Sequence, residues 1–381
     1  MRLLYVHYGP QSGVTESVTR ALLEAGVDLR HFNPLDGFTY QLRLGPLLVP
    51  NARPAVVRAV AAAMRRHGAH WKPYYLHTTR AFDALSERCA EAIAATRPEL
   101  VLQAGALFGA GPYPQVPYFL YLDHTRAIAE RYAPMEGLPP PIPYEEAWRA
   151  RERATYRNAA GIFTMSEYVR ASLRADYGVD GARVHVIGAG PNVEPGPSDL
   201  GVHREKAFLF VGRNFVPKGG PELLAAFAAV RAVHPDARLW IVSKHRPATA
   251  PPGVTFHGLL EPPALARLYA RASAFVLPTL REAFGLSFLE AMAFALPCIG
   301  TRIEAIPEIV SENETGLLVP PRDPAALANA MRELLADPVR ARLMGAAGRA
   351  RVAQRYGWDR GAARILAVLL PGRAARTQRA G

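Results

Sequence analysis

The sequence predicts an α/β protein built from two doubly wound, Rossmann-like domains. Short apolar runs that are typical of buried strands alternate with segments of helical periodicity through most of the 381 residues. This alternation is interrupted by a stretch rich in proline, glycine and serine, residues 191–206, and then starts again. A chain of this length is long for one hydrophobic core and suits two domains.

In the first half, continuous apolar runs predict strands that are buried on both faces, as in a parallel sheet. The predicted strands cover residues 3–7, 27–31, 74–77, 100–103, 118–122, 161–164 and 184–187. The predicted helices cover residues 54–66, 80–96, 144–159 and 167–177. Ser166 precedes the last of these helices, and we interpret it as the N-cap. The proline-rich stretch 135–146 is interpreted as a stiff connector ahead of a helix.

The second half repeats the pattern after the 191–206 linker. Its predicted strands cover residues 207–211, 238–242, 274–277, 297–300 and 316–319. Its predicted helices cover residues 222–233, 263–272 and 324–335, with a further helix around Glu290 and a long final helical region. Because ligands bind such sheets at the carboxyl ends of strands, the loops after 207–211 and 274–277 are the first places to look for a site.

Composition indicates a reduced globular protein. Of its residues, 50% are hydrophobic and 20% are charged, which is ordinary usage. Cys89 and Cys298 lie in apolar surroundings, which is typical of buried thiols in a cytoplasmic protein. The chain starts with an apolar strand-like run instead of a signal sequence, and no run reaches the roughly 20 apolar residues of a spanning helix. We therefore expect a cytoplasmic protein.

The net charge of +12 is concentrated in the second half. Residues 1–200 carry 21 Lys and Arg against 19 Asp and Glu, whereas residues 201–381 carry 24 against 14. An anionic ligand in the second half is the natural interpretation, with nucleic acid and an anionic membrane as competitors. A solvated arginine-rich surface on the C-terminal helices would explain the same charge. No zinc-ligand spacing and no basic-aromatic stripe favours nucleic acid.

Two glutamates eight residues apart, Glu282 and Glu290, are the most informative pair in the chain. Eight residues of helix rise about 12 Å, which exceeds the roughly 5–9.5 Å that separates the two carboxylates of a glycosidase. Such a pair can instead hold two ends of an elongated ligand. Between them, Ala283, Phe284 and Gly285 offer the free N–H groups of a helix start, which suit a phosphate. The pattern indicates a nucleotide-sugar site.

Arg213 and Lys218 follow the predicted strand 207–211 and its Gly212. A diphosphate leaving group gains negative charge as the sugar–phosphate bond breaks, and fixed cations beside it lower that barrier. An arginine can contact two phosphate oxygens while a lysine acts as a compact charge. Gly219, beside Gly220, allows the backbone to approach the ligand closely.

The segment E-A-F-G-L-S-F-L-E-A-M-A (282–293) resembles the E-x7-E motif of retaining GT-B glycosyltransferases, in particular family 4. The resemblance continues through FVGRNFVPKGG (210–220) and IPEIVSENETGLLVPPRDPAALANAMRELLADP (306–338), and it is strong from about residue 155 to 360. An E-x7-E spacing alone occurs by chance in many helices. In this order of motifs it is highly specific.

The resemblance implies a role for each of these residues. Arg213 and Lys218 bind the donor diphosphate, Glu282 faces the donor sugar near its anomeric centre, and Glu290 accepts hydrogen bonds from the ribose. The donor-binding backbone then comprises Gly212, Gly219, Ala283, Phe284, Gly285 and Leu286.

In the first half, His124 follows strand 118–122, and the resemblance implies that it meets the donor sugar from the opposing domain. A neutral histidine can donate to a sugar hydroxyl, and a general base is also conceivable. Gly13 closes the sequence GPQSG (9–13), where related enzymes show a glycine pair near donor and acceptor. Here Pro10 and Gln11 interrupt the glycines. Lys244, His245 and Arg246 either reach the nucleotide or form a basic surface loop.

The implied fold is GT-B, with two Rossmann-like domains facing a central cleft and a C-terminal helix that crosses back to the N-terminal domain. The predicted limits are 1–195 together with 359–381 for the acceptor-side domain, and 203–358 for the donor domain. The implied reaction transfers a sugar from a nucleoside-diphosphate donor to an acceptor hydroxyl with retention. No cofactor and no metal is expected, because Arg213, Lys218 and a helix start can stabilise the leaving group.

Three alternatives stay open at this point. Another GT-B enzyme, such as a nucleotide-sugar epimerase or a glucan synthase, would share the layout, although the Lys-x-Gly-Gly loop of glucan synthases is absent. A non-catalytic sugar-nucleotide-binding protein would share the fold. A peripheral membrane enzyme with a lipid-linked acceptor is compatible with Arg53, Arg58, Arg65 and Arg66 around an apolar helix. The expected partners are a nucleotide-sugar donor and a carbohydrate or glycoside acceptor, and no nucleic acid. Peripheral contact with an anionic membrane at the inner face is the further partner that this last alternative adds.

Overall fold

The computed structural model describes residues 1–44, 47–110, 116–131, 144–196, 205–245 and 247–370. The chain divides into two compact units. The first contains the chain up to Ile187 together with the C-terminal segment from Ala362, and the second contains Gly188–Gly361. The helix α13 (Trp358–Leu369) therefore begins in the second unit, and its later residues belong to the first.

The sheet of the first unit is parallel and has the strand order β2-β1-β5-β6-β7-β8. Its strands are β1 (Arg2–Val6), β2 (Asp28–Phe32), β5 (Leu100–Ala104), β6 (Tyr118–Leu122), β7 (Gly161–Thr164) and β8 (Val184–Val186). Its helices are α1 (Val14–Glu24), α2 (Pro54–His67), α3 (Thr79–Thr96), α4 (Arg126–Glu130), α5 (Glu146–Asn158) and α6 (Glu167–Tyr177). A separate antiparallel hairpin pairs β3 (Gln41–Leu44) with β4 (Leu47–Pro50).

The sheet of the second unit is also parallel, with the order β11-β10-β9-β12-β13-β14. Its strands are β9 (Ala207–Val211), β10 (Arg238–Val242), β11 (Val254–Gly258), β12 (Ala274–Leu277), β13 (Cys298–Thr301) and β14 (Gly316–Val319). Its helices are α7 (Gly220–Arg231), α8 (Pro262–Arg271), α9 (Leu286–Ala293), α10 (Ile306–Ile309), α11 (Pro324–Ala336) and α12 (Pro338–Arg355). This is the strand order of dinucleotide-binding folds, and it reverses between β9 and β12.

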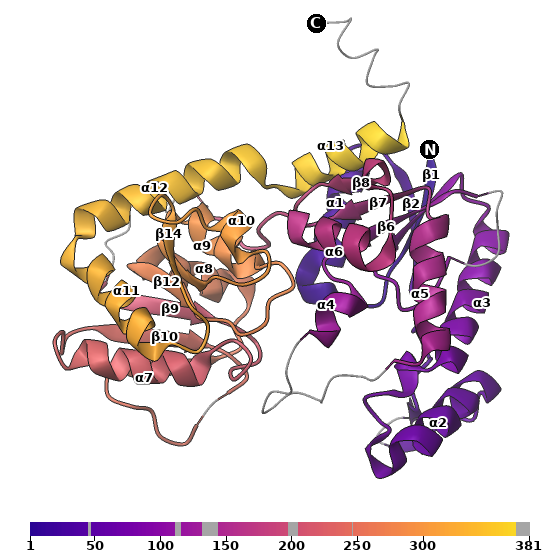
Figure 1. Ribbon diagram of the computed structural model, residues 1–381, viewed down its shortest axis with the longest axis horizontal. Coiled ribbons are helices and arrows are strands. Elements are labelled where there is room, and N and C mark those ends of the chain that lie inside the picture. Colours follow the sequence, from indigo (N-terminus) through magenta and orange to yellow (C-terminus); the bar gives the residue numbers. More distant parts are fainter. Residues whose placement is uncertain (45–46, 111–115, 132–143, 197–204, 246, 371–381) are drawn as a thin grey trace, which may run out of the picture. The chain divides into compact units, whose positions relative to one another are not determined.

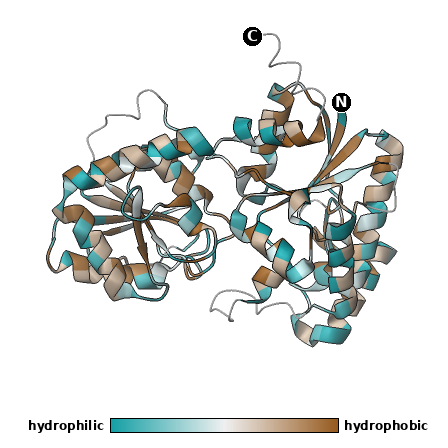
Figure 2. Ribbon diagram, turned by 45° about the horizontal axis from the view of Figure 1, so that its top comes forward, coloured by the Kyte–Doolittle hydropathy of each residue, from teal (hydrophilic) through white to brown (hydrophobic). Residues whose placement is uncertain are grey.

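Apolar strands explain why both sheets are covered on both faces. In β9, Phe208, Leu209 and Phe210 are fully buried, and every residue of β12 is buried. Figure 2 shows the strands as mostly hydrophobic and the surrounding helices as mixed, with hydrophilic and hydrophobic residues on each. Helices α7 and α11 lie side by side along one face of the second sheet (Figure 1). A parallel sheet needs such layers because its strands carry apolar residues on both sides.

Side-chain caps fix several helix starts. The hydroxyl of Ser166 accepts a hydrogen bond from the backbone N–H of Val169 at 3.2 Å, so its predicted N-cap role is confirmed. Asp323 caps α11 in the same way through the N–H of Ala326 at 2.8 Å. A cap satisfies one of the donors that the first turn of a helix leaves unpaired.

Six predicted strands have the bounds of β6, β7, β9, β10, β12 and β14: 118–122, 161–164, 207–211, 238–242, 274–277 and 316–319. The predicted helix 167–177 has the bounds of α6, and the other predicted strands and helices shift by one or a few residues, with one exception. The predicted strand 74–77 is wrong, because Tyr75–His77 forms a short 3-10 helix. Its apolar residues serve the core rather than a sheet: Tyr75 is buried and its hydroxyl donates to the carbonyl oxygen of Phe38 at 3.2 Å. The sequence did not predict α1, α4, α10, β11 or the β3–β4 hairpin.

Parts of three predicted segments lie outside the described residues: 197–204 of the linker, 135–143 of the proline-rich connector and 371–381 of the C-terminal region. The predicted domain limits stay a prediction. Among the described helices, none combines the length and the apolar character that crossing a bilayer requires.

Candidate active site

Two loops at the strand-order reversal of the second sheet carry the predicted site. One loop follows β9 and contains Arg213 and Lys218, and the other follows β12 and contains Glu282. Because β9 and β12 are parallel neighbours, both loops leave the carboxyl edge of the sheet at adjacent positions. The structure thus brings together residues that are 64 positions apart in the chain.

Lys218 and Glu282 form an ion pair. The Lys218 Nζ lies 2.7 Å from the Glu282 Oε2 and also donates to the carbonyl oxygen of Arg281 at 3.0 Å. The two side chains are mostly buried, with 22% and 13% of their surfaces exposed. Water and salt screen such a pair less than an exposed one. The aliphatic part of Lys218 packs over Gly212, where a Cβ atom would lie 3.0 Å from the Lys218 Cγ.

Glycine at position 219 lets the two loops approach each other. Gly219 has a φ of +75°, and a Cβ atom there would lie 1.9 Å from the carbonyl oxygen of Pro278. Neither that conformation nor that distance tolerates a side chain. The neighbouring N–H of Leu280 donates to the carbonyl oxygen of Pro217 at 2.9 Å, which links the loops a second time.

The hydroxyl groups of two threonines, Thr279 and Thr301, hydrogen-bond to the backbone of the loop after β12. The Thr279 hydroxyl donates to the carbonyl oxygen of Arg281 at 2.8 Å, and the Thr301 hydroxyl donates to the carbonyl oxygen of Thr279 at 2.5 Å. Both hydroxyl-bearing residues are buried. The backbone that presents Glu282 is therefore fixed by internal hydrogen bonds on the protein side.

Helix α9 follows this loop and starts at Leu286, and Gly285 before it has a φ of +114°. Glu282 lies in the loop, so only the residues from Leu286 to Glu290 are helical. The rise of eight helical residues therefore does not describe the distance from Glu282 to Glu290. The backbone N–H groups of Ala283, Phe284, Gly285 and Leu286 have no acceptor in the described part of the chain. They are available to a ligand, as a helix start requires.

Glu290 is buried inside the second unit, with a residue exposure of 7%. Its Oε2 accepts a hydrogen bond from the Tyr269 hydroxyl at 2.9 Å, and the backbone of Asn192 and Val193 also hydrogen-bonds to its carboxylate. Burial raises the pKa of Glu290 to about 7. An exposed helix carboxylate is thus excluded. The role of Glu290 toward a ribose stays a prediction. In that role the carboxylate would accept hydrogen bonds from the ribose in addition to those from its present protein donors.

Arg213 is exposed beside the loop after β10. Its carbonyl oxygen accepts from the N–H of Lys244 at 3.1 Å, so the two predicted basic positions are neighbours. The ring of His245 stacks on Phe215 with centroids 4.6 Å apart. The sequence analysis did not anticipate this stacked pair, whose partners are 30 residues apart. Arg246 lies outside the described residues.

A third glutamate, Glu304, joins the site and was missed. It follows β13, the neighbour of β12, and its Oε2 accepts from the backbone N–H of Glu282 at 2.6 Å. Burial raises its pKa to about 7. Its place after a strand at the same edge of the sheet was the signal that could have found it.

The predicted residues of the first half lie in the first unit. His124 and Asp123 follow β6 and are half-buried. Gly13 has a φ of +87° and precedes α1, and the carbonyl oxygen of Gly9 accepts from the Thr15 hydroxyl at 2.7 Å. The glycine-containing segment 9–13 is thus a helix entry at the carboxyl end of β1. The roles of His124 and Gly13 toward a donor stay predictions.

A polar network lies beside His124. The Tyr144 hydroxyl is 2.8 Å from the His77 Nδ1, and the Arg126 guanidinium lies over the Tyr144 ring at 5.6 Å from its centroid. Burial lowers the pKa of His77 to about 3, with nearby Arg126 adding to the effect. His77 is therefore neutral at physiological pH. Glu152 accepts hydrogen bonds from the hydroxyls of Tyr156 and Tyr177 at 2.9 and 2.8 Å.

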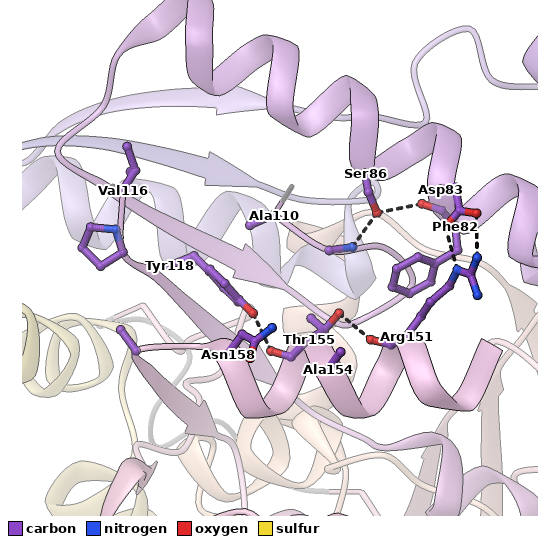
Figure 3. Close-up of a pocket in the computed structure, with 13 residues that line it drawn as sticks. Phe82, Asp83, Ser86, Ala110, Val116, Tyr118, Arg151, Ala154, Thr155 and Asn158 are labelled. Carbon is purple, nitrogen blue, oxygen red and sulfur yellow. Dashed lines mark hydrogen bonds and ion pairs between the residues drawn. The ribbon is translucent and has the colours of Figure 1, made fainter. Parts of the chain in front are cut away.

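A hollow of about 660 Å³ lies elsewhere in the first unit (Figure 3). Its wall is largely apolar, with an ion pair between Arg151 and Asp83 at one side and Tyr118, whose hydroxyl donates to the carbonyl oxygen of Thr155 at 2.7 Å. Tyr118 begins β6, so the hollow lies at the amino end of that strand. It contains none of the predicted site residues. Among the described residues no group of three or more His, Cys, Asp or Glu is arranged to hold a metal ion.

We predict that replacing Glu290 with glutamine flattens the pH dependence of stability. The folded pKa of about 7 lies above the ordinary value of 4.5, so the folded state favours the proton and wild-type stability falls as the pH rises from about 4.5 to about 7. The loss attributable to this group is at most about 3 kcal/mol. Urea unfolding of both proteins between pH 5 and 8 measures it. Glu314→Gln, an exposed site in the same unit, should keep the wild-type slope, and parallel slopes for wild type and Glu290→Gln would contradict the prediction.

Comparisons with known proteins identify the fold of the chain and a family that its second half resembles. Residues 205–337 match the model of the family described as glycosyl transferases group 1. Glycogen synthase from Mycobacterium tuberculosis is 33% identical over 192 residues, which is 48% of this chain and 44% of that protein. The chain spans about half the length of the curated relatives it matches.

Solved structures cover both units. Sucrose-phosphate synthase from Thermosynechococcus elongatus superposes with a TM-score of 0.72 at 23% identity, covering 98% of this chain and 100% of that one. Alr3699/HepE from Anabaena, in complex with UDP and glucose, superposes with a TM-score of 0.65 at 14% identity, covering 97% and 99%. At these identities the superpositions show the two-domain GT-B fold. Residues 205–337, most of the second unit, therefore resemble the glycosyl transferases of group 1, and the chain as a whole has the GT-B fold.

Proposed function

We propose that the chain is a retaining glycosyltransferase that moves a sugar from a nucleoside-diphosphate donor to an acceptor hydroxyl. The observation that carries this proposal is the Lys218–Glu282 pair, 2.7 Å apart at the strand-order reversal, next to unpaired N–H groups of residues 283–286. A cation, a carboxylate and free backbone donors at one point match the needs of a sugar diphosphate: charge compensation for the phosphates and an acceptor for sugar hydroxyls.

The ion pair suggests how the donor enters. Without a ligand, Lys218 neutralises Glu282, and the pair is mostly withdrawn from water. A diphosphate offers Lys218 more negative charge than one carboxylate, so the lysine shifts toward the phosphates. Glu282 is then free to accept a hydrogen bond from a sugar hydroxyl. The donor thereby replaces the Lys218–Glu282 contact with a contact from Lys218 to the phosphates and one from a sugar hydroxyl to Glu282. The interaction with Lys218 becomes stronger as the leaving group gains charge.

Arg213 adds a second cation to the leaving-group side. It is exposed in the loop after β9, before Lys218. In this proposal both cations and the N–H groups of Ala283–Leu286 stabilise the departing diphosphate, and no metal or other cofactor is needed. No described side chain is assigned as a covalent nucleophile. The resemblance instead implies a front-face route, in which the acceptor attacks from the side on which the diphosphate leaves. In that route the leaving diphosphate removes the proton from the acceptor hydroxyl.

The related proteins support this substrate class. Alr3699/HepE binds UDP and glucose, and the curated relative is a glycogen synthase. We propose that the second unit binds the donor and that the first unit, with His124 and Gly13, selects the acceptor. The acceptor is a carbohydrate or glycoside hydroxyl. The buried free thiols of Cys89 and Cys298 fit an enzyme of the reducing cytoplasm.

Lys218→Ala is predicted to lower kcat/KM by about 100-fold or more, as the loss of a contact to developing charge does. A panel of UDP-, GDP- and ADP-sugars, followed by nucleoside-diphosphate release, identifies the donor and then measures the variant. Lys206→Ala is the matched control, because Lys206 pairs with Asp236 at the same 2.7 Å on the exposed surface. Equal turnover by wild type and Lys218→Ala would remove Lys218 from the site. Tight donor binding without turnover by wild type would favour a non-catalytic sugar-nucleotide-binding protein.

Retention is tested on the product. Proton NMR of the new glycosidic linkage should show the anomeric configuration of the donor, because the front-face route forms the new bond on the side the diphosphate leaves. The coupling constant at the anomeric proton reports the configuration directly. An inverted product would refute the retaining assignment while leaving glycosyl transfer intact.

A specific surface favours a second proposal, contact with an anionic membrane. Residues 41–80 contain seven Lys and Arg and no Asp or Glu. The same stretch exposes Leu47 and Leu48 at 65% each, Val57 at 49% and Met64 at 50%. Val57 and Met64 are seven residues apart on α2, hence on one face. One of these cations, Arg66, pairs with Glu145 from outside the stretch. Exposed apolar side chains among an excess of cations are the composition of a surface that docks on anionic lipid.

Liposomes test the membrane proposal. Wild type should co-sediment with vesicles containing anionic lipid at low salt and be released at 1 M salt, where the screening length falls to about 3 Å. Arg58→Glu combined with Arg65→Glu should weaken binding at low salt. The control combines Arg20→Glu with Arg322→Glu, two exposed positions outside residues 41–80. Equal loss in both double variants would indicate net charge alone, and equal sedimentation with neutral vesicles would contradict the proposal.

A further inference from the structure

Glu304 is kept in an unfavourable conformation and environment. Its backbone has a φ of +48°, a region that residues with a Cβ atom rarely adopt. Its Oε1 is buried without a hydrogen-bond partner among the described residues. Burial also raises the pKa of its carboxyl group, since the charged form loses its hydration. A smaller residue, such as glycine, would remove each of these costs.

Among the described residues, the other carboxyl oxygen accepts one hydrogen bond, and the donor belongs to the candidate active site. Glu304 Oε2 accepts from the backbone N–H of Glu282 at 2.6 Å. The Glu282 side chain is held separately by Lys218, at 2.7 Å. Glu282 is therefore fixed at two points, its backbone from the β13 side and its carboxylate from the β9 side. The backbone contact does not depend on Lys218, so it persists when Lys218 turns to a diphosphate.

Strain and unsatisfied polar atoms persist where the surrounding structure and its function demand them. Here Glu304 has both the strained backbone and the unpaired oxygen. Its hydrogen bond goes to Glu282, which the proposed function places against the donor sugar. We propose that Glu304 is a positioning residue of the donor site, which holds the backbone of Glu282 so that its carboxylate meets the sugar in one orientation. This inference rests on the proposed function.

Two substitutions separate positioning from a purely structural role. Glu304→Ala removes the acceptor for the Glu282 N–H and should lower kcat between about 10-fold and 100-fold, as small misplacements of a substrate do, with a smaller change in donor KM. Its melting temperature at pH 8 should not fall, because the substitution also removes a buried carboxyl with an unpaired oxygen. Glu304→Gln keeps an acceptor oxygen and should restore kcat to within about threefold of wild type. Glu314→Ala, exposed in the same unit, is the matched control.

A readout independent of any donor completes the test. Hydrogen exchange of a peptide covering residues 279–286 should speed up by about tenfold in Glu304→Ala and stay near wild type in Glu304→Gln, because the amide of Glu282 loses its acceptor only in the first. Unchanged exchange in Glu304→Ala overturns the proposal whatever the enzyme's activity. So does wild-type kcat in Glu304→Ala, a proportionate fall in its melting temperature, or a Glu304→Gln variant as slow as Glu304→Ala. If wild type releases no nucleoside diphosphate from any donor, the proposed function fails, and with it the role assigned to Glu304.

Discussion

The ion pair between Lys218 and Glu282 is the interaction on which the site depends. It joins the loop after β9 to the loop after β12, and these strands are neighbours only because the sheet reverses its order between them. Each partner is largely withdrawn from water, so removing one leaves a charge with little solvent to stabilise it. In the structure the two charges therefore neutralise each other across one 2.7 Å contact.

The second unit keeps two more carboxyl groups away from water, and both cost stability for the same reason. Glu290 on α9 and Glu304 after β13 have pKa values raised to about 7 by burial. Their partners differ in kind. Glu290 is matched by Tyr269 and by the backbone at Asn192 and Val193, whereas Glu304 leaves one oxygen unpaired. The carboxyl group of Glu290 is thus hydrogen-bonded on the protein side. The unpaired oxygen of Glu304 destabilises the fold and needs a functional explanation.

The sequence predicted most of this architecture because buried parallel strands need uninterrupted apolar residues. The runs A-F-L-F-V (207–211) and A-F-V-L (274–277) are typical of such strands. It also predicted that the loops carrying Lys218 and Glu282 lie together, since both follow strands of one parallel sheet, but it did not predict the ion pair between the two side chains. The same logic misread residues 74–77, where a short apolar run packs as a 3-10 turn. Glu304 escaped notice because its contact is to a backbone N–H, which leaves no trace in side-chain spacing. The roles of His124 and Gly13 rest on a different unit and stay predictions.

Gly219 sets a limit on how this protein can be diversified. With a φ of +75° and only 1.9 Å between a hypothetical Cβ atom and the Pro278 carbonyl oxygen, the position accepts no other amino acid without separating the two loops. A saturation library at that codon would return the parent residue alone. Exposed Arg213, six residues earlier in the same loop, has no such backbone constraint, so only its proposed contact with a diphosphate limits what can replace it. A library that varies this loop to alter ligand preference therefore has to keep codon 219 fixed.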